Sequence, residues 1–169
     1  MALERFSSLT HSYNWYENFT YRTQNSPVDC FCRREGTVGE KPVKILLIEP
    51  DHLLAGTYRK ALEYAGHKVR LAATAQAAIH AADVMRPDLV ILEMQLVSHS
   101  GVEFLYEFRS YPDWQAIPVV AVSNVPPGEF AESRELLHEE LGVRTYHYKP
   151  RTTLRALLKT VDSFVPIQL

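Results

Sequence analysis

The sequence lacks three features that would each point to a class of protein. No apolar run reaches the roughly 18 residues that indicate a membrane-spanning helix. The 18 Lys and Arg residues nearly balance the 20 Asp and Glu residues, so the net charge of −2 gives no electrostatic reason to expect binding to nucleic acid or membrane. The first residues, Met1 to Arg5, do not begin a secretory signal. We therefore expect a cytoplasmic protein that binds neither nucleic acid nor membrane directly.

Cysteine is also scarce. Cys30 and Cys32 are the only two cysteines, and with one residue between them a disulfide bridge would be strained. Free thiols in a reducing cytoplasm are the better interpretation. A single C-x-C pair lacks the second pair of ligands that zinc requires, so we expect no metal site there.

The hydrophobic pattern of the sequence changes near residue 42. Residues 1–41 show no sustained hydrophobic period and hold six aromatic residues between positions 6 and 21. We interpret 1–41 as an aromatic-rich extension and linker, 42–165 as one folded domain and 166–169 as a short tail. The aromatic side chains either cover the domain's own surface or dock on a partner protein. The candidates for partner binding are Tyr13, Trp15, Tyr16, Phe19 and Tyr21.

From residue 43 onward, apolar strands alternate with amphipathic helices. The expected strands cover residues 43–48, 69–73, 89–92, 118–122 and 144–148. Helices are expected after the capping residues Asp51 and Thr74, from Gly101, from Pro126 to Leu141, and from Leu154 to Val161. Strands that are joined by helical crossovers form a parallel sheet, which predicts an α/β fold with helices on both faces of the sheet.

Four polar residues directly follow these strands. Glu49 comes after the first strand, Glu93 after the third, Ser123 after the fourth and Lys149 after the fifth. Because parallel strands present their carboxyl ends at one edge of the sheet, where α/β folds place their sites, these side chains should meet in one cleft. There, Lys149 can offset the charge of the carboxylates and Ser123 can donate a hydrogen bond to one of them.

The segments around these residues resemble the receiver domain of two-component response regulators. The resemblance covers residues 43 to about 164 and rests on five motifs: Ile45–Asp51, Pro87–Glu93, Gly101, Ile117–Ser123 and Tyr146–Pro150. It implies a flavodoxin-like receiver fold, with a five-stranded parallel sheet of order 2-1-3-4-5 and helices on both faces. It also places the family's switch aromatic at Tyr146. The bond before Pro150 is a candidate cis peptide, because the cis form costs far less before proline than elsewhere.

Two departures from the family pattern change the expected chemistry. In the family, an aspartate at the position of Glu93 accepts phosphate from a histidine kinase. Acids at the positions of Glu49 and Pro50 hold Mg²⁺, together with that aspartate and a backbone carbonyl at the position of Gln95. Proline supplies no side-chain ligand, so Mg²⁺ binding is expected to be weak or absent. Asp51 lies one position too late and is expected to cap a helix. The chain thus resembles a pseudo-receiver with a degenerate phosphoacceptor pocket.

These departures favour a receiver-like module that acts in signalling or assembly by protein–protein contact, without phosphorylation and without enzymatic activity. In relatives, the face made by the fourth helix, fifth strand and fifth helix commonly carries dimer or partner contacts, so a homodimer through this face is a candidate. The alternative is a phosphoacceptor response regulator of a two-component phosphorelay with a modified site. A transcription regulator is disfavoured, since no helix-turn-helix or basic patch follows Leu158.

The role of Glu93 has two interpretations. Close to Lys149 and Ser123, its carboxylate can imitate a phosphorylated aspartate, with one negative charge in place of nearly two. This mimic hypothesis predicts that Ser123 is drawn toward Glu93 and that Tyr146 is turned inward. In the other interpretation, Glu93 only balances the charge of Lys149 in a retired site. Tyr146 itself is expected to be a core aromatic, and it can act as the switch residue as well.

Overall fold

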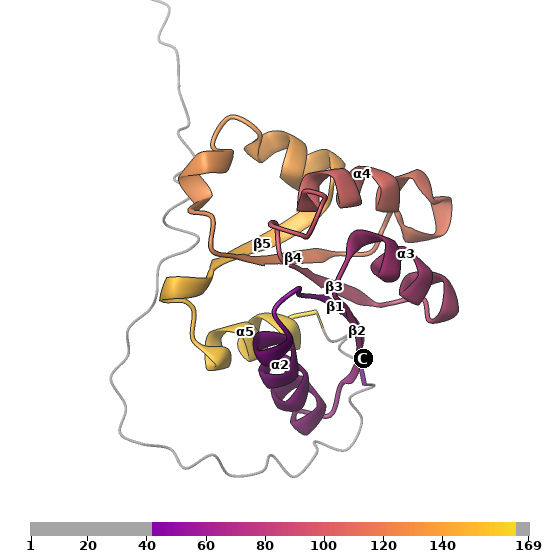
Figure 1. The fold of residues 1–169 in the computed structure, drawn as a ribbon, viewed down its shortest axis with the longest axis vertical. Coiled ribbons are helices and arrows are strands. Elements are labelled where there is room, and N and C mark those ends of the chain that lie inside the picture. The colour runs from indigo at the N-terminus through magenta and orange to yellow at the C-terminus, as the bar shows by residue number, and fades with distance from the viewer. Residues whose placement is uncertain (1–41, 165–169) are drawn as a thin grey trace, which may run out of the picture. The chain divides into compact units, whose positions relative to one another are not determined.

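Five parallel strands form the central sheet of the computed structural model, which describes residues 42–164 (Figure 1). The strands are β1 (Lys44–Ile48), β2 (Lys68–Ala72), β3 (Leu89–Leu92), β4 (Val119–Ser123) and β5 (Val143–Tyr148). Their order across the sheet is β2-β1-β3-β4-β5, which confirms the predicted topology. The predictions for residues 1–41, including the aromatic candidates and the two cysteines, and for the tail 166–169 lie outside the described residues.

The central strands are buried on both faces. Every residue of β3 and β4 is buried, and in β1 only Lys44 is partly exposed. Continuous runs of Val, Ile and Leu are typical of parallel strands that have helices on both sides. The edge strand β2 has a mixed pattern, with Lys68, Arg70 and Leu71 exposed. Burial of the centre of the sheet thus fixes the position of every strand end, and with it the position of the residues that follow.

Within the described residues, four α-helices cover the sheet. Figure 1 shows α2 (His52–Tyr64) and α5 (Leu154–Asp162) on one face, and α3 (Ala75–Val84) and α4 (Gly101–Ser110) on the other. Each helix begins after a residue whose side chain accepts a hydrogen bond from a backbone N–H of the first turn. These caps are Asp51, Thr74, Ser100 and Thr153, of which the first two were predicted. Such a cap typically stabilises a helix by about 1 kcal/mol.

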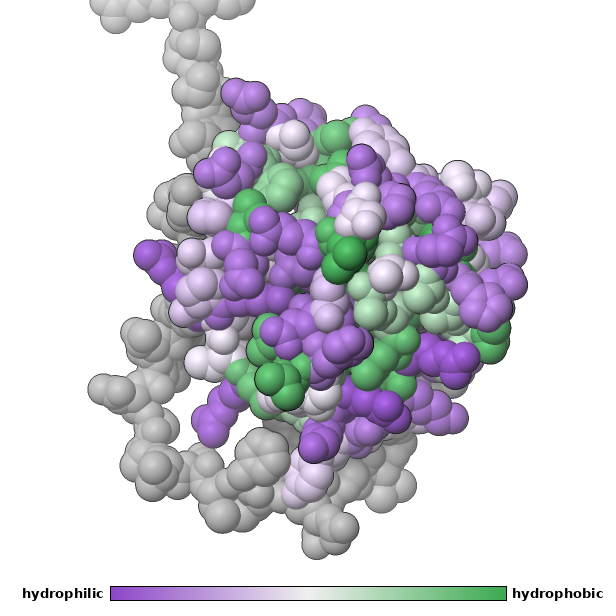
Figure 2. All heavy atoms as spheres, in the orientation of Figure 1, coloured by the Kyte–Doolittle hydropathy of each residue, from purple (hydrophilic) through white to green (hydrophobic). Residues whose placement is uncertain are grey.

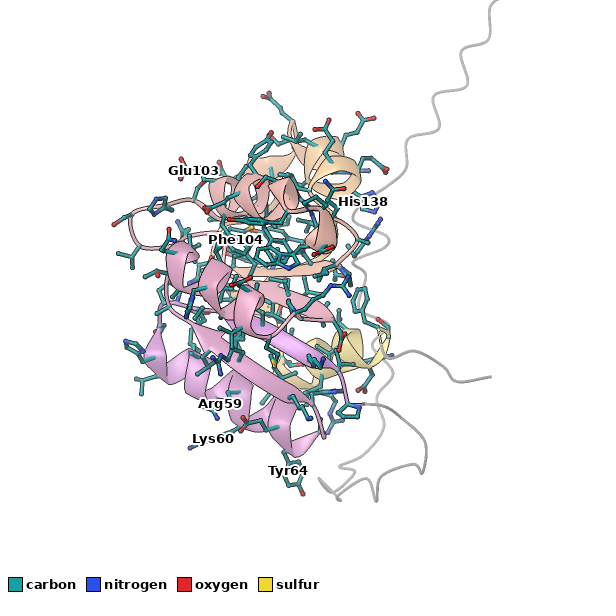
Figure 3. All side chains as sticks on the ribbon, turned by 90° about the vertical axis from the view of Figure 1, so that its right-hand side faces the viewer. Arg59, Lys60, Tyr64, Glu103, Phe104 and His138 are labelled. Atoms are coloured by element: carbon teal, nitrogen blue, oxygen red, sulfur yellow. The ribbon has the colours of Figure 1, made fainter. Side chains whose placement is uncertain are left out.

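The hydrophobic core has a layer on each face of the sheet. The layer on the side of α2 and α5 contains Val43, Ile45, Leu47, Leu62, Leu89, Ile91, Val120, Val122, Leu157 and Val161. On the other side, Phe104 and Phe108 of α4 are buried, and the ring of Phe108 stacks on that of Trp114 at 5.0 Å. Figure 3 shows Phe104 between α4 and the sheet, while Glu103 of the same helix lies on its outer side.

The predicted fourth helix is not continuous, and this prediction was wrong. The segment forms a 3-10 helix, η2 (Pro127–Phe130), and a separate π-helix, η3 (Leu136–Glu140). Only Leu137 in these two elements is buried, so little apolar surface holds the segment in helical form. Its five glutamates also repel one another at helical spacings of three and four: Glu129, Glu132, Glu135, Glu139 and Glu140. Gly142, with φ +69°, ends η3 near the predicted stop.

Arg109 ties the end of α4 to the segments that lead into β4 and β5. Its guanidinium donates to the carbonyls of Trp114 at 2.6 Å, Gln115 at 2.9 Å and Ile117 at 2.7 Å. Two further bonds, at 3.0 and 2.9 Å, go to the carbonyl of Leu141. Backbone oxygens therefore accept hydrogen bonds from all five N–H groups of the side chain. These partners are neutral carbonyl groups and not a carboxylate.

The surface in the view of Figure 2 is mostly hydrophilic, with hydrophobic side chains in several separate groups. The large hydrophobic residues that are exposed in the described part of the chain are Leu53, Tyr64, Leu71, Val84, Val97, Tyr106 and Tyr111. They come from several different elements, and isolated exposed apolar residues are normal on a protein surface. Among residues 42–164, no helix has both the length and the apolar character to cross a membrane.

Candidate functional site

The four polar residues predicted to meet do come together at the carboxyl edge of the sheet. Ile48 pairs with Leu92 and Ser123 pairs with Tyr148 in the parallel ladders. The residues that follow β1, β3 and β5 are therefore Glu49, Glu93 and Lys149, next to one another at the edge that also holds Ser123. Glu49 and Glu93 are each 4% exposed and Ser123 is fully buried.

Both oxygens of the Glu93 carboxylate are engaged. Oε1 accepts hydrogen bonds from the Ser123 hydroxyl and, at 2.9 Å, from the backbone N–H of Gln95. Oε2 lies 2.5 Å from the Nζ of Lys149. The longer side chain of glutamate thus reaches a hydroxyl, an amide and an ammonium at once, and such charge-assisted bonds are the stronger kind.

Lys149 joins the two carboxylates. Its Nζ donates to Oε2 of Glu49 at 2.6 Å, in addition to its contact with Glu93. Burial by itself lowers the pKa of Lys149, but its hydrogen bonds to Glu49 and Glu93 outweigh burial and the net shift is upward. Lys149 therefore stays charged, and the three side chains carry a formal net charge of −1.

Asp51 lies outside this cluster, as the sequence predicts. One of its side-chain oxygens accepts from the backbone N–H groups of Leu53 at 2.8 Å and Leu54 at 3.1 Å, where it caps α2. The bonds from Leu54 and Leu53 lower the pKa of its carboxyl group. Its own backbone N–H donates to Oε1 of Glu49 at 3.1 Å. The neighbouring Pro50 offers no side-chain oxygen, so only two carboxylates enter the pocket.

The loop after β3 is held close to the pocket. The backbone N–H of Gly101 donates to the carbonyl of Met94 at 2.8 Å, and Gln95 forms an isolated bridge with Ser100. A Cβ atom at Gly101 would lie 2.8 Å from the Cα of Met94, which is too close for any side chain. The glycine that the family pattern places here is therefore required by a close backbone approach.

Tyr146, the predicted switch aromatic, is turned inward and is 2% exposed. Its hydroxyl donates to the carbonyl of Val125 at 2.6 Å, and its ring lies 5.8 Å from that of Phe130. The N–H of Val125 in turn donates to the Ser123 hydroxyl oxygen at 3.2 Å. Burial raises the pKa of the Tyr146 hydroxyl to about 12. Tyr146 is therefore both a core aromatic and part of the chain of contacts that begins at Glu93.

The Lys149–Pro150 bond is trans, so the prediction of a cis peptide was wrong. The preference for trans before proline is only about 0.5–1 kcal/mol, and local contacts decide between the two forms. Here, residues 149–151 form a 3-10 turn, in which the N–H of Thr152 donates to the carbonyl of Lys149 at 3.1 Å. The Thr152 hydroxyl also donates to the carbonyl of Tyr148 at 2.8 Å.

Two participants were not predicted from the sequence. Val125 links Ser123 to Tyr146 through its backbone N–H and carbonyl only, so its side chain carries no signal of this role. Tyr58, a residue of α2, is the second participant. Burial raises the pKa of its hydroxyl, and the charges of Lys149, Glu49 and Glu93 act on it as well. An amphipathic aromatic facing a charged rim is the signal that could have identified it.

A comparison with known protein families defines the class. The response regulator receiver domain matches residues 45–161, which is more than half of the chain. The chain belongs to the family of response regulator receiver domains. Domains of this family are signalling modules of two-component systems, and they interact with proteins such as kinases and effectors.

Individual relatives agree with this membership. The chain is 31% identical over 106 residues to the KDP operon transcriptional regulatory protein KdpE of Escherichia coli strain K12, which covers 63% of this chain and 44% of KdpE. It is 27% identical over 125 residues to the polar-differentiation response regulator DivK of Brucella anthropi, which covers 73% of this chain and 97% of DivK. The chain thus spans less than half the length of KdpE and nearly all of DivK.

Solved structures show the same fold. The chemotaxis response regulator CheY4 of Vibrio cholerae has a TM-score of 0.65 at 22% identity, covering 73% of this chain and 99% of CheY4. A CheY-like receiver domain from Methylobacillus flagellatus has a TM-score of 0.63, also at 22% identity, covering 73% of this chain and 99% of that domain. At this level of identity the likeness concerns the fold alone.

Proposed function

We propose that this chain is a receiver module that signals by protein–protein contact without being phosphorylated, and that it is not an enzyme. The observation that carries the proposal is the state of Glu93. A glutamate stands at the end of β3, and both of its carboxylate oxygens are engaged by Ser123, Gln95 and Lys149. Pro50 removes one of the family's two acids beside it. The residue at the phosphoacceptor position and the acids beside it that would help to neutralise charge are thus both changed.

The contacts of Glu93 also favour the mimic hypothesis over a retired site. A retired site needs only the ion pair with Lys149. The Ser123 hydroxyl donates to Glu93 as well, and Tyr146 lies inward against Val125, which is the arrangement that the mimic hypothesis predicts. A carboxylate offers two oxygens and one charge where a phosphoryl group offers three oxygens and nearly two charges, so the imitation is partial.

The partner surface proposed for this module is the face made by η3, β5 and α5. Arg151, Arg155 and Lys159 lie along the exposed side of the last helix and the turn before it, at spacings of four residues. The segment with η2 and η3 carries five glutamates. A face that is acidic on one side and basic on the other is complementary to its own copy under two-fold symmetry. A homodimer in the cytoplasm, without direct contact to nucleic acid, is therefore the proposed assembly.

The function is tested by offering the protein a phosphodonor. After incubation with acetyl phosphate and Mg²⁺, the intact mass should show no added phosphoryl group. The double variant Pro50→Asp/Glu93→Asp restores the family's acids and serves as the matched control, which should gain the adduct. A stoichiometric adduct on the unmodified protein would instead support a phosphoacceptor of a two-component phosphorelay with a modified site.

A further inference from the structure

The family's Mg²⁺ site does not fit the residues of this pocket. Pro50 supplies no ligand atom, and Asp51 directs its carboxylate to the first turn of α2. Residues 42–164 contain no group of three or more His, Cys, Asp or Glu side chains that could hold a metal ion. Mg²⁺ requires near-octahedral coordination by oxygen, which two carboxylates paired to an ammonium do not offer.

The position between the two carboxylates is taken by Lys149. Its Nζ lies 2.6 Å from Oε2 of Glu49 and 2.5 Å from Oε2 of Glu93. Both distances fall within the roughly 2.3–2.6 Å that separate Ca²⁺ from its oxygen ligands. The ammonium thus occupies the point from which a divalent cation would reach both oxygens.

The remaining oxygens of the pocket have other donors. Oε1 of Glu49 accepts from the N–H of Asp51, and Oε1 of Glu93 accepts from Gln95 and Ser123. The side chains of Lys149 and the two glutamates are 8% and 4% exposed. A divalent cation would therefore have to displace the ammonium to reach both Oε2 atoms.

We propose that the ammonium of Lys149 replaces the divalent cation, so that the pocket is complete without metal. This inference concerns the same pocket as the proposed function but does not depend on it, since phosphorylation-independent signalling is compatible with either cation. Its consequence is specific: removal of the ammonium should leave two buried carboxylates facing one point. They should then recruit a divalent cation that the unmodified protein ignores.

The test compares the unmodified protein with Lys149→Met, a variant of similar length without charge. Thermal unfolding is followed in EDTA, in 20 mM MgCl₂ or CaCl₂, and in NaCl of equal ionic strength, with concentrations on the order of those that reveal millimolar binding. The Tm of the unmodified protein should be the same in all three. Lys149→Met should unfold at lower temperature in EDTA and regain about 5 °C or more with the divalent salt. Lys60→Met, an exposed lysine of α2, is the matched control and should respond to neither salt.

Two results would overturn the inference. One is a rise in the Tm of the unmodified protein with MgCl₂ or CaCl₂ beyond the NaCl reference. The other is a folded Lys149→Met that gains nothing from either divalent salt. If Lys149→Met folds only when a divalent salt is present, the inference is supported. If it folds under no condition, Lys149→Arg decides: a folded, salt-insensitive Lys149→Arg supports the inference, and one whose Tm rises with CaCl₂ contradicts it.

Discussion

The extra methylene of Glu93 brings its carboxylate within reach of three different donors. Aspartate at this position would hold its oxygens nearer to β3, and the hydroxyl of Ser123 would need a phosphoryl group to bridge the gap. Glutamate closes that gap with its own oxygens, which receive the Ser123 hydroxyl and the Lys149 ammonium. In the proposed function, the state of the pocket is therefore set by one side chain and not by a reversible modification.

Replacing Glu93 by Gln keeps the shape of the side chain and removes its charge. We expect the free energy of unfolding to fall by about 1–3 kcal/mol, because Lys149 loses one of its two charged partners.

If the mimic hypothesis holds, Tyr146 also leaves its inward position in Glu93→Gln, and affinity for a partner falls by about 1–3 kcal/mol. NMR contacts of the labelled Tyr146 ring report its orientation. Glu107→Gln on the exposed side of α4 is the control. A Tyr146 ring that stays inward in a folded Glu93→Gln contradicts the mimic hypothesis.

His147 links β5 to α5 in a way that depends on pH. Its Nε2 lies 2.9 Å from the Thr160 hydroxyl oxygen, and that hydroxyl donates to the carbonyl of Ala156 at 3.1 Å. Nε2 therefore carries the hydrogen of this contact. Burial lowers the pKa of His147 below its ordinary value near 6.5. As the pH falls through 6.5, the unfolded chain takes up the proton first, so stability is present above this pH and is lost below it.

Urea unfolding at pH 7.5 and pH 5.5 measures this contribution. We expect the unmodified protein to lose more stability between these two values than His147→Gln, by up to about 1 kcal/mol, since the lower pH lies about one unit below the ordinary pKa. His80→Gln, an exposed histidine of α3, should keep the pH dependence of the unmodified protein. Equal pH dependence in His147→Gln and the unmodified protein would show that His147 does not titrate differently on folding.

At the scale of elements, the sequence predicted the strands closely and one helix poorly. β1 after Lys44 and all of β3 are continuous apolar runs, so burial alone fixes them, and the residues that follow, Glu49 and Glu93, are fixed with them. The segment with η2 and η3 has Leu137 and Leu141 at helical spacing, but its glutamates and sparse burial decide against a continuous helix. Which oxygen Ser123 or Lys149 contacts depends on side-chain rotamers, and these are set by packing that no periodicity encodes.

The proposed homodimer face predicts the effect of a charge reversal. Lys159→Glu adds a negative charge to the basic side of α5, where a second copy would present the glutamates of η3, so dimerisation should weaken by about tenfold or more. Sedimentation velocity over a range of concentrations measures the strength of dimerisation.

Lys60→Glu, on the outer side of α2 in Figure 3, is the control and should dimerise as before. The double variant Lys159→Glu/Glu135→Lys should regain part of the affinity. A chain that is monomeric at all concentrations contradicts the proposed dimer.

At the scale of the whole molecule, the aromatic-rich extension is predicted to serve recognition and not the core. The described core runs from Val43 to Val161 and is closed by residues of the sheet, α2 and α5. A chain without residues 1–41 should therefore unfold cooperatively, with a free energy of unfolding within about 1 kcal/mol of the full chain. Urea denaturation followed by circular dichroism measures this free energy, and deletion of 165–169 is the control.

Partner binding or assembly should be impaired in the chain without residues 1–41. A broad, non-cooperative transition would mean that the extension belongs to the domain's own packing.

The guanidinium of Arg109 has a mechanical consequence for this receiver. It pins the chain just before β4, at Ile117, and just before β5, at Leu141, to the same helix. The opposite ends of these strands carry Ser123 and Lys149. The stretch from residue 124 to residue 140 thus connects the strand end at Ser123 to a point that Arg109 holds at Leu141. We expect a change at Ser123 to displace this stretch less near Leu141 than near Phe130, whose ring lies 5.8 Å from that of Tyr146.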